Sequence, residues 1–441
     1  MKRAVDFFRT KIGYRGGYIY NTSSDLTKRE GEEVVTPTQV WIQPPATPTV
    51  GEAYLNAYQA CGEKYLLEAA RETAECLIQG QLRSGGWFQL IEFDSQAREA
   101  YDYRVDPPGD VSKKKRRLTT IDDNKTQSCL RFLMRLDREL EFKDAPLHEA
   151  VTYGLDKLVE SQYPNGAWPQ QFSEPPNPAE FPVKKASYPE SWPRKFPAVN
   201  YTKFYTFNDD SIADVVALML EATDVYGESR YKAAAEKAGD FIILAQMPEP
   251  QPAWAQQYDA EMHPVWARKF EPASITGGES QGVIEILMDL YRATGNDRYL
   301  APIPSAVAYL KRSELSGNRL ARFYELHTNK PLYFTKKYEL TYDDSDLPTH
   351  YGFVVGSKAE TLQAAYDKLR AQGPPAKQAA TAERPKASAK LASAAAEVAG
   401  RLDDRGAWVE DGSFDDEPTK VITSRTFVKN LAALARYAGA R

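Results

Sequence analysis

Two pairs of adjacent aspartates are the first residues in this chain that could carry chemistry. Asp122 and Asp123 lie in the segment TIDDNKT, and Asp209 and Asp210 lie in the segment TFNDDSIA. Each pair comes directly before an apolar run with helical spacing, where an acidic residue commonly caps the helix and favours its dipole. For either pair alone we favour the capping role. The occurrence of two such helix starts in one chain predicts two walls of a single cation site.

Carboxylate oxygens suit a hard cation, and room for several carboxylates favours calcium over magnesium. Histidine is scarce, since the chain has four, and none of them shows a metal-binding spacing such as HxxxH. A zinc site and a Ser-His-Asp relay are therefore poorly supported. Neither a P-loop nor a dinucleotide fingerprint is present. Carboxylates, arginines and aromatic residues are the groups left to carry a function.

Two arginine segments supply the opposite charge. Arg268 stands in ARKFEP and Arg322 in ARFYE, and each is followed by aromatic residues and a glutamate. A guanidinium group can bind a carboxylate through two parallel hydrogen bonds. The two segments together therefore predict a site for an acidic ligand. For one arginine alone, an ion pair with glutamate that stiffens a loop is an equally good interpretation.

The elements that would position these residues form a repeat. An aromatic residue preceded by small residues recurs at intervals of 69 to 86 residues. The positions are Tyr18, Trp87, Trp168, Trp254, Phe323 and Trp408. Each interval has room for two helices, and turns at Gly62, Gly227 and Gly295 predict where one helix ends and the next begins. Because helical hairpins bury their inner faces by stacking, we expect an all-α fold, an α/α toroid with long loops over one face.

The spacing of apolar residues predicts helices along most of the chain. They are expected over residues 53–60, 64–80, 124–138, 145–162, 210–225, 229–245, 279–294, 298–313, 357–371, 386–401 and 422–439. We expect residues 1–356 to form the catalytic toroid. Residues 357–441 would add a helical segment that completes the same domain, with a linker at 373–391. Long loops at 101–119 and 172–200 each lead into an aspartate pair, and such loops are often functional.

Composition excludes several classes of protein. The chain has 441 residues, 42% of them hydrophobic, and a net charge of −5, so no global field attracts nucleic acid. Three cysteines cannot form a disulfide framework, and the basic run at 113–117 is interpreted as a solvated loop. No run of about 18 apolar residues predicts a membrane span. The N-terminal segment lacks the apolar region of a signal peptide.

Six ordered motifs resemble the pectate lyases of polysaccharide lyase family 10. They are TIDDNKT, YPNGAWPQQF, YTFNDDSIADVV, AWAQQYD with PVWARKFEP, GGESQGV and ARFYELHTNKPLYF, and the resemblance as a whole runs, with gaps, from about Tyr14 to Phe353. The resemblance implies an (α/α)3 toroid that cleaves polygalacturonate by calcium-assisted β-elimination and releases 4,5-unsaturated oligogalacturonates. It also implies a secreted or periplasmic enzyme. We expect a monomer that acts on an acidic polysaccharide and binds neither nucleic acid nor membrane.

The resemblance further implies roles for individual residues. Asp122 and Asp209 correspond to acids at the calcium and the substrate, Arg268 to the proposed Brønsted base, and Arg322 to an arginine that grips a substrate carboxylate. Lys336 stands where the family commonly has the arginine of a GRDG motif, so we expect it to act as a point charge. The other expected substrate-binding residues are Asp123, Asp210, Lys125, Trp254 and Tyr324.

Three alternatives stay open at the level of sequence. An arginine normally titrates far above working pH, so Arg268 could serve as a base only where its cationic form is disfavoured, and it could instead only bind substrate. A hydrolase could use Asp122 and Asp209 as acid and base, without calcium and with a saturated product. A non-catalytic protein could bind an acidic glycan through the same aromatic and basic side chains.

Overall fold

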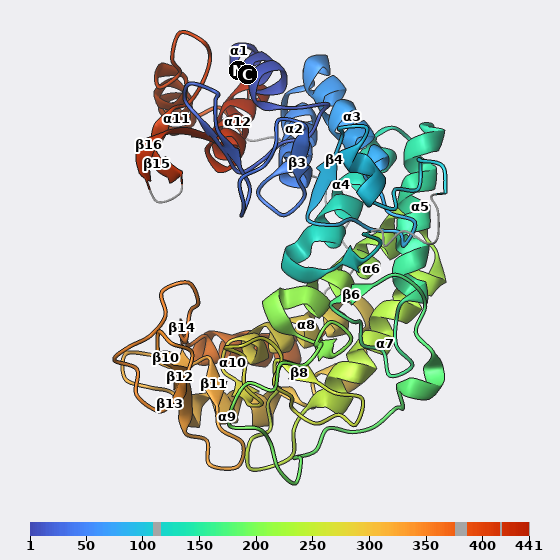
Figure 1. Ribbon diagram of the computed structural model, residues 1–441, viewed down its shortest axis with the longest axis vertical. Coiled ribbons are helices and arrows are strands. Elements are labelled where there is room, and N and C mark those ends of the chain that lie inside the picture. The colour runs from blue at the N-terminus through green and yellow to red at the C-terminus, as the bar shows by residue number, and fades with distance from the viewer. Residues whose placement is uncertain (109–115, 375–385, 415–416, 441) are drawn as a thin grey trace. The chain divides into compact units, whose positions relative to one another are not determined.

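The chain divides into two compact units in the computed structural model, which describes residues 1–108, 116–374, 386–414 and 417–440. Unit 1 contains Met1–Leu158 and Ala379–Arg441, and unit 2 contains Val159–Gln378. Figure 1 labels the elements of both units. Residues 113–115 of the basic run and 375–385 of the expected linker lie outside the described residues.

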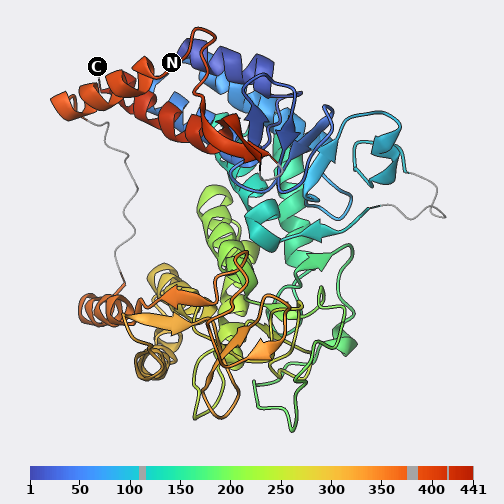
Figure 2. The same ribbon diagram turned by 60° about the vertical axis from the view of Figure 1, so that its left-hand side comes forward.

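Unit 1 brings the two ends of the chain together. Its helices are α1 (Lys2–Phe7), α2 (Thr47–Cys61), α3 (Lys64–Gln79), α4 (Lys125–Glu139), α5 (Ala145–Glu160), α11 (Ala389–Gly400) and α12 (Ser424–Gly439). Helix α12 packs against α2, and Figure 2 shows these C-terminal helices in red beside the blue N-terminal ones. The rings of Phe427 and Phe8 stack with their centroids 3.8 Å apart. The C-terminal segment therefore completes the core of the N-terminal hairpins.

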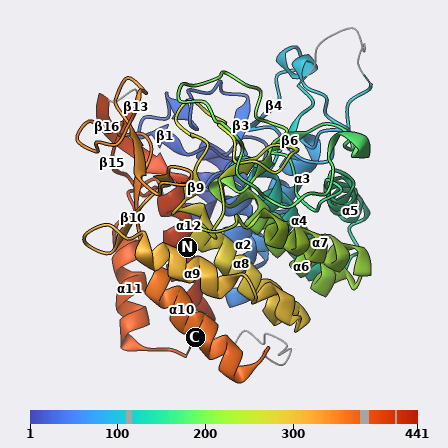
Figure 3. The same ribbon diagram turned by 90° about the horizontal axis from the view of Figure 1, so that it is seen from below.

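Unit 2 repeats the hairpin architecture. Its helices are α6 (Ser211–Tyr226), α7 (Ser229–Ala245), α8 (Glu279–Thr294), α9 (Ile303–Arg312) and α10 (Ala359–Gln372). Helix α10 packs against α8 and α9, and Figure 3 shows these three helices alongside one another. Helix α10, at the start of the expected C-terminal segment, therefore belongs to unit 2.

Each of three predicted turns ends a helix at a glycine. Gly62, Gly227 and Gly295 follow α2, α6 and α8 with φ angles of 75°, 73° and 70°. This left-handed conformation suits glycine, and the amide of each caps the last helical turn. The following helix begins later than expected in one case. Helix α9 starts at Ile303, not at 298, because Pro302 and Pro304 are tolerated only before or within a first turn.

The recurring aromatic residue marks a recurring contact. The indole N–H of a buried tryptophan donates to a carbonyl near the end of the preceding helix, 2.8 Å away in each case. The donor and acceptor pairs are Trp87 with Leu77, Trp254 with Ile242, and Trp408 with Val398. The repeat read from the sequence is therefore confirmed as a structural unit.

A glutamine closes each of three hairpin loops in the same way. It follows the helix before the loop, and its amide group donates to two backbone carbonyls, one in the loop and one at a later helix. The bonds run from Gln81 to Gly85 and Ala150, from Gln162 to Gly166 and Ala234, and from Gln246 to Pro252 and Pro302, at 2.8–3.0 Å. These bonds, buried at Gln81 and Gln162 and partly buried at Gln246, fix where each loop leaves its hairpin.

Short β-strands lie within the loops between the helices. In unit 1 they are β1 (Asn21–Ser23), β2 (Arg29–Glu30), β3 (Gln39–Trp41), β4 (Leu90–Glu92), β5 (Thr119–Thr120), β15 (Glu410–Phe414) and β16 (Glu417–Thr423). In unit 2 they are β6 (Gln171–Phe172), β7 (Tyr205–Thr206), β8 (Gln257–Tyr258), β9 (Ile275–Thr276), β10 (Arg319–Ala321), β11 (Phe323–Tyr324), β12 (Pro331–Phe334), β13 (Leu340–Thr341) and β14 (Val354–Gly356). The largest sheets have four strands, ordered β15-β16-β1-β2 and β13-β12-β11-β9. Among the described helices, none has both the length and the apolar character needed to cross a membrane.

Candidate active site

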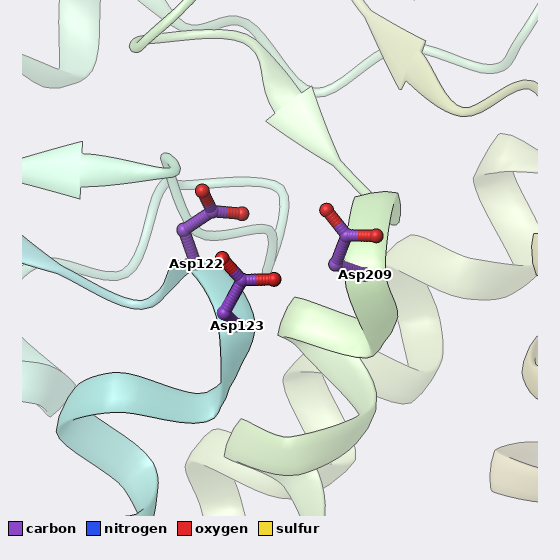
Figure 4. Close-up of side chains that lie close together, drawn as sticks. All are labelled: Asp122, Asp123 and Asp209. Carbon is purple, nitrogen blue, oxygen red and sulfur yellow. The ribbon is translucent and has the colours of Figure 1, made fainter. Parts of the chain in front are cut away.

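The starts of helices α4 and α6, which contain the aspartate pairs, share an unusual backbone conformation. Asp123 and Asn124 precede α4 with φ angles of 49° and 57°, and Asp209 and Asp210 precede α6 with φ angles of 47° and 55°. Non-glycine residues seldom adopt two consecutive left-handed conformations, and Asn and Asp tolerate them best. Figure 4 shows the carboxylates of Asp122, Asp123 and Asp209 at these helix starts.

The aspartates do not cap the helices that they precede. The residues at the capping positions, Asn124 and Asp210, make no side-chain capping hydrogen bond to α4 or α6. The capping interpretation, which we favoured for either pair alone, is therefore wrong. Instead, a threonine hydroxyl organises each turn. Thr120 accepts from the amide of Asp122 at 3.3 Å, and Thr206 accepts from the amide of Asn208 at 3.1 Å.

The start of helix α4, in unit 1, presents two neighbouring carboxylates. A carboxylate oxygen of Asp122 and one of Asp123 lie within 4.8 Å of each other. The ammonium group of Lys125 lies 2.9 Å from Oδ2 of Asp123 and balances that charge. Oδ1 of Asp122 is buried and accepts no hydrogen bond from any described residue. A buried carboxylate oxygen without a donor is a fitting ligand for a hard cation.

The start of helix α6, in unit 2, forms an ion pair with an arginine. Nη2 of Arg268 lies 3.3 Å from Oδ2 of Asp209 and donates at 2.5 Å to Oε1 of Glu271, whose side chain is fully buried. Burial acts to lower the pKa of Arg268, but the hydrogen bond and charge of Glu271 and the charge of Asp209 outweigh it. The pKa therefore lies well above the ordinary value for arginine, and the guanidinium is charged in this arrangement.

Arg322 belongs to a second buried pair. Its Nη1 donates at 2.7 Å to Oε1 of Glu279, and its Nε donates at 2.7 Å to the carbonyl of Gly352. Burial acts to lower the pKa of Arg322, and the charge of Glu279 more than offsets it. Nη2 donates no hydrogen bond within the part of the chain that the structure describes, so it is available to an anionic ligand.

A pocket of about 490 Å³ joins several of these side chains within unit 2. Asp209, Asp210, Glu279, Arg322 and Lys358 contribute to its lining. Burial, and after it the charges of Glu279 and Glu285, raises the pKa of Asp210. The pocket therefore offers both charged hydrogen-bond donors and carboxylates to a polar, anionic ligand.

Two expected substrate-binding residues lie elsewhere. Trp254 is fully buried, and its indole contacts the end of α7. Tyr324 is 1% exposed, and its hydroxyl donates to the carbonyl of Ser313 at 2.6 Å. Trp254 is a core residue of the repeat, and Tyr324, next to the repeat position Phe323, is also buried in the core. The expectation that they bind substrate is therefore corrected.

Lys336 lies apart from the arginines. Its side chain is 66% exposed and pairs with Asp346 at 3.4 Å. Among the described residues it makes no ion pair with Asp209 or Glu279, the carboxylates that hold the two arginines. Its role as a replacement for the family arginine remains a prediction.

Four further residues organise the unit 2 site, namely Glu271, Glu279, Gln256 and Tyr351. The first three stand in recognised motifs, ARKFEP, GGESQGV and AWAQQYD, but of these only Glu271 was considered, as a partner for Arg268. Tyr351 stands outside these motifs, and its importance comes from contacts between distant segments.

A family profile described as pectic acid lyase matches residues 98–320 of the chain. A search of the curated proteins finds no match. Among solved structures, a family 10 polysaccharide lyase from Cellvibrio cellulosa is 23% identical, with 67% of this chain and 91% of that chain covered and a TM-score of 0.49. The D-to-A mutant of a family 10 polysaccharide lyase from the same organism, in complex with trigalacturonic acid, is 22% identical, with coverages of 73% and 98% and a TM-score of 0.50. The second likeness shows the fold, and the expected α/α-toroid fold class is confirmed.

Proposed function

Because the chain belongs to the pectic acid lyase family and is therefore a polysaccharide lyase, we propose that it is a pectate lyase. Its substrate would be α-1,4-polygalacturonate, cleaved by calcium-assisted β-elimination to 4,5-unsaturated oligogalacturonates. We further propose that it acts as a monomer outside the cell or in the periplasm. The observation that carries the proposal is that Arg268 and Arg322, each held by a buried glutamate, lie in the same unit as Asp209.

The chemistry of a uronate explains why such a site is needed. The proton on C5 is α to a carboxylate, so it is only weakly acidic. Its removal creates enolate-like charge on that carboxylate, and fixed positive groups stabilise this charge. Nη2 of Arg322 is the guanidinium nitrogen free to bind the substrate carboxylate. Glu279 and Gly352 hold the other nitrogens of Arg322 in place, so little reorganisation is required when charge develops.

We propose that Asp122 and Asp209 hold the calcium, as the family resemblance implies. Within unit 1, Asp123 lies near Asp122 and pairs with Lys125. The donor set fits, because Oδ1 of Asp122 is buried without a hydrogen bond and all of these acids offer hard oxygen ligands. When bound, calcium would supply positive charge next to the substrate carboxylate. The same charge would offset the negative field that Asp209 imposes on Arg268.

Two roles are proposed for Arg268, with the base preferred. Its carboxylate partners favour the charged form, which cannot accept a proton. A base role therefore requires that the influence of Glu271 and Asp209 be weakened when substrate and cation are bound. Nε of Arg268 is buried and donates to no described residue, so one nitrogen is not committed to either carboxylate. If Arg268 only binds substrate, its pairs would remain intact throughout the reaction.

An ultraviolet assay on polygalacturonate tests the proposal. Elimination leaves a C4–C5 double bond, so absorbance in the near ultraviolet should rise with time, stop on addition of EDTA and resume with calcium. The Arg268→Ala variant should abolish the rise while it largely preserves binding of trigalacturonate. A matched control is Arg292→Ala, because Arg292 pairs with Asp289 on the surface of α8.

Two outcomes would contradict the proposal. New reducing ends without an absorbance rise would indicate a hydrolase that uses Asp122 and Asp209 as acid and base. Binding of polygalacturonate without any cleavage would indicate a glycan-binding protein.

Equal losses of binding and rate in the Arg268→Ala variant would assign that residue to substrate binding alone.

A further inference from the structure

The two arginines of unit 2 are linked by one tyrosine. The ring of Tyr351 lies under both guanidinium groups, with its centroid 4.6 Å from Cζ of Arg322 and 6.0 Å from Cζ of Arg268. Its hydroxyl accepts from Nη1 of Arg322 and donates to Oε1 of Glu271, at 3.4 Å in each case. Tyr351 therefore contacts Arg322 directly and reaches Arg268 both through its ring and through Glu271.

Gln256 completes the link. It is 2% exposed, and the two hydrogens of its Nε2 are shared among three acceptors, the hydroxyl of Tyr351 at 3.0 Å, Oε1 of Glu279 at 3.0 Å and Oδ1 of Asn208 at 2.6 Å. Asn208 in turn donates to Oδ2 of Asp209 at 2.5 Å.

Two closed rings of hydrogen bonds result. The first ring runs through Gln256, Asn208, Asp209, Arg268, Glu271 and Tyr351. The second ring runs through Gln256, Glu279, Arg322 and Tyr351. The contact between Gln256 and Tyr351 belongs to both rings.

Aromatic packing fixes the tyrosine ring independently of its hydroxyl. Phe270, which follows Arg268 by two residues, packs at 4.7 Å from the Tyr351 ring, and Phe353 packs at 5.4 Å. Phe323, which follows Arg322, stacks at 6.3 Å. Removal of the hydroxyl alone should therefore break both rings and leave the position of the aromatic group unchanged.

We propose that Tyr351 is a positioning residue that holds Arg268 and Arg322 in a single arrangement for the uronate substrate. This inference rests on the proposed lyase function and deepens it. In the wild-type protein, Oε1 of Glu271 accepts hydrogen bonds from both the Tyr351 hydroxyl and Arg268. Without the hydroxyl, Glu271 loses its hydrogen bond from Tyr351, and Arg322 loses one of its orienting contacts, so the two guanidinium groups are no longer held through a common residue.

The test compares Tyr351→Phe with Tyr338→Phe. Tyr338 packs in the same aromatic cluster, 6.0 Å from Phe270, and its hydroxyl makes no hydrogen bond within the described segments. We expect Tyr351→Phe to lower kcat about tenfold, in line with the loss of a hydrogen bond to a charged group, with a smaller change in KM. Tyr338→Phe should leave kcat and KM unchanged, and both variants should keep the wild-type Tm.

Two results would overturn the proposal. The first is an unchanged kcat in Tyr351→Phe, and the second is a loss of rate that only follows a lowered Tm. If the wild type gives no absorbance rise on polygalacturonate, the lyase function itself fails, and the role of Tyr351 is then tested by calorimetric binding of trigalacturonate to the same two variants. Equal affinities would then overturn that role as well.

Discussion

The two helix starts have the same backbone but different neighbours. Asp123 and Asp209 occupy equivalent positions, with φ angles of 49° and 47°. Asp123 pairs with Lys125, two residues along the chain, whereas Asp209 pairs with Arg268, 59 residues away. The ion pair of Asp123 is therefore formed within one short segment, whereas the ion pair of Asp209 depends on the tertiary structure of unit 2.

The position before each of these aspartates differs in a complementary way. In unit 1 it is Asp122, which has a buried oxygen without a hydrogen bond. In unit 2 it is Asn208, which is fully buried and bonded to Gln256 and Asp209. One local fold thus serves two purposes, because the unit 1 start leaves an oxygen ligand available and the unit 2 start connects a carboxylate to an arginine.

The largest expected effect comes from one change made at the equivalent positions. Asp209→Asn should lower kcat by about 10²–10³-fold, the range seen when an electrostatic group of an active site is removed, because it disrupts the contact with Arg268 and removes a proposed calcium ligand. Asp123→Asn should cost far less, because it removes a carboxylate already balanced by Lys125. Initial rates of absorbance on polygalacturonate measure both. Equal losses would show that the two starts do not divide their roles as proposed.

The second prediction concerns calcium. Asp122→Asn introduces the amide that unit 2 has at this position, and it should raise the calcium concentration for half-maximal rate by at least about tenfold. Saturating calcium should restore most of the rate, because Arg268 and Arg322 are untouched. Calcium titrations of the variant and of Asp289→Asn, an exposed control on α8, provide the comparison. An unchanged titration would remove Asp122 from the metal site.

The smallest effect is expected from Asp210→Asn, which introduces the residue type of Asn124, its equivalent in unit 1. The folded protein raises the pKa of Asp210 above its ordinary value of 3.8, so the folded state holds this proton more tightly than the unfolded chain does. The free energy of unfolding should therefore fall as pH rises through this window and then level off.

The Asp210→Asn variant should lack this dependence and gain about 1–3 °C in Tm at neutral pH. Thermal melts between pH 3 and pH 7 would measure the effect, with catalytic rate followed in parallel. A variant that melts at a lower temperature than the wild type at neutral pH would contradict the assignment of an unfavourable charge to Asp210.

Local patterns in the sequence were sufficient for the helices and for the repeat. Periodic apolar residues, glycine turns and recurrent tryptophans are all short-range signals, and the structure has a helix at each predicted range. Helix α2 begins at Thr47 rather than 53, α9 begins at Ile303 rather than 298, and α1 was not predicted. The same signals led to an error at Trp254 and Tyr324. Aromatic residues near charged motifs suggested ligand contact, whereas repetition in every hairpin is the mark of a core position.

The site itself could be predicted only in part. Asp209, Arg268 and Arg322 stand in recognisable motifs, so their chemistry was apparent from the sequence. Tyr351 and Gln256 come from segments 95 residues apart, and only the folded chain brings their side chains together. The failure of the capping interpretation has a related cause, because two left-handed residues before a helix cannot be read from composition.

The bonded glutamines at the hairpin loops also bear on how this architecture could diversify. Gln162 secures the loop at Gly166, well before the long segment 172–200 begins. Chain inserted or deleted beyond such an anchor need not disturb the helices behind it. Changes in the length of these segments could thus alter specificity during evolution while the helical hairpins keep their structure.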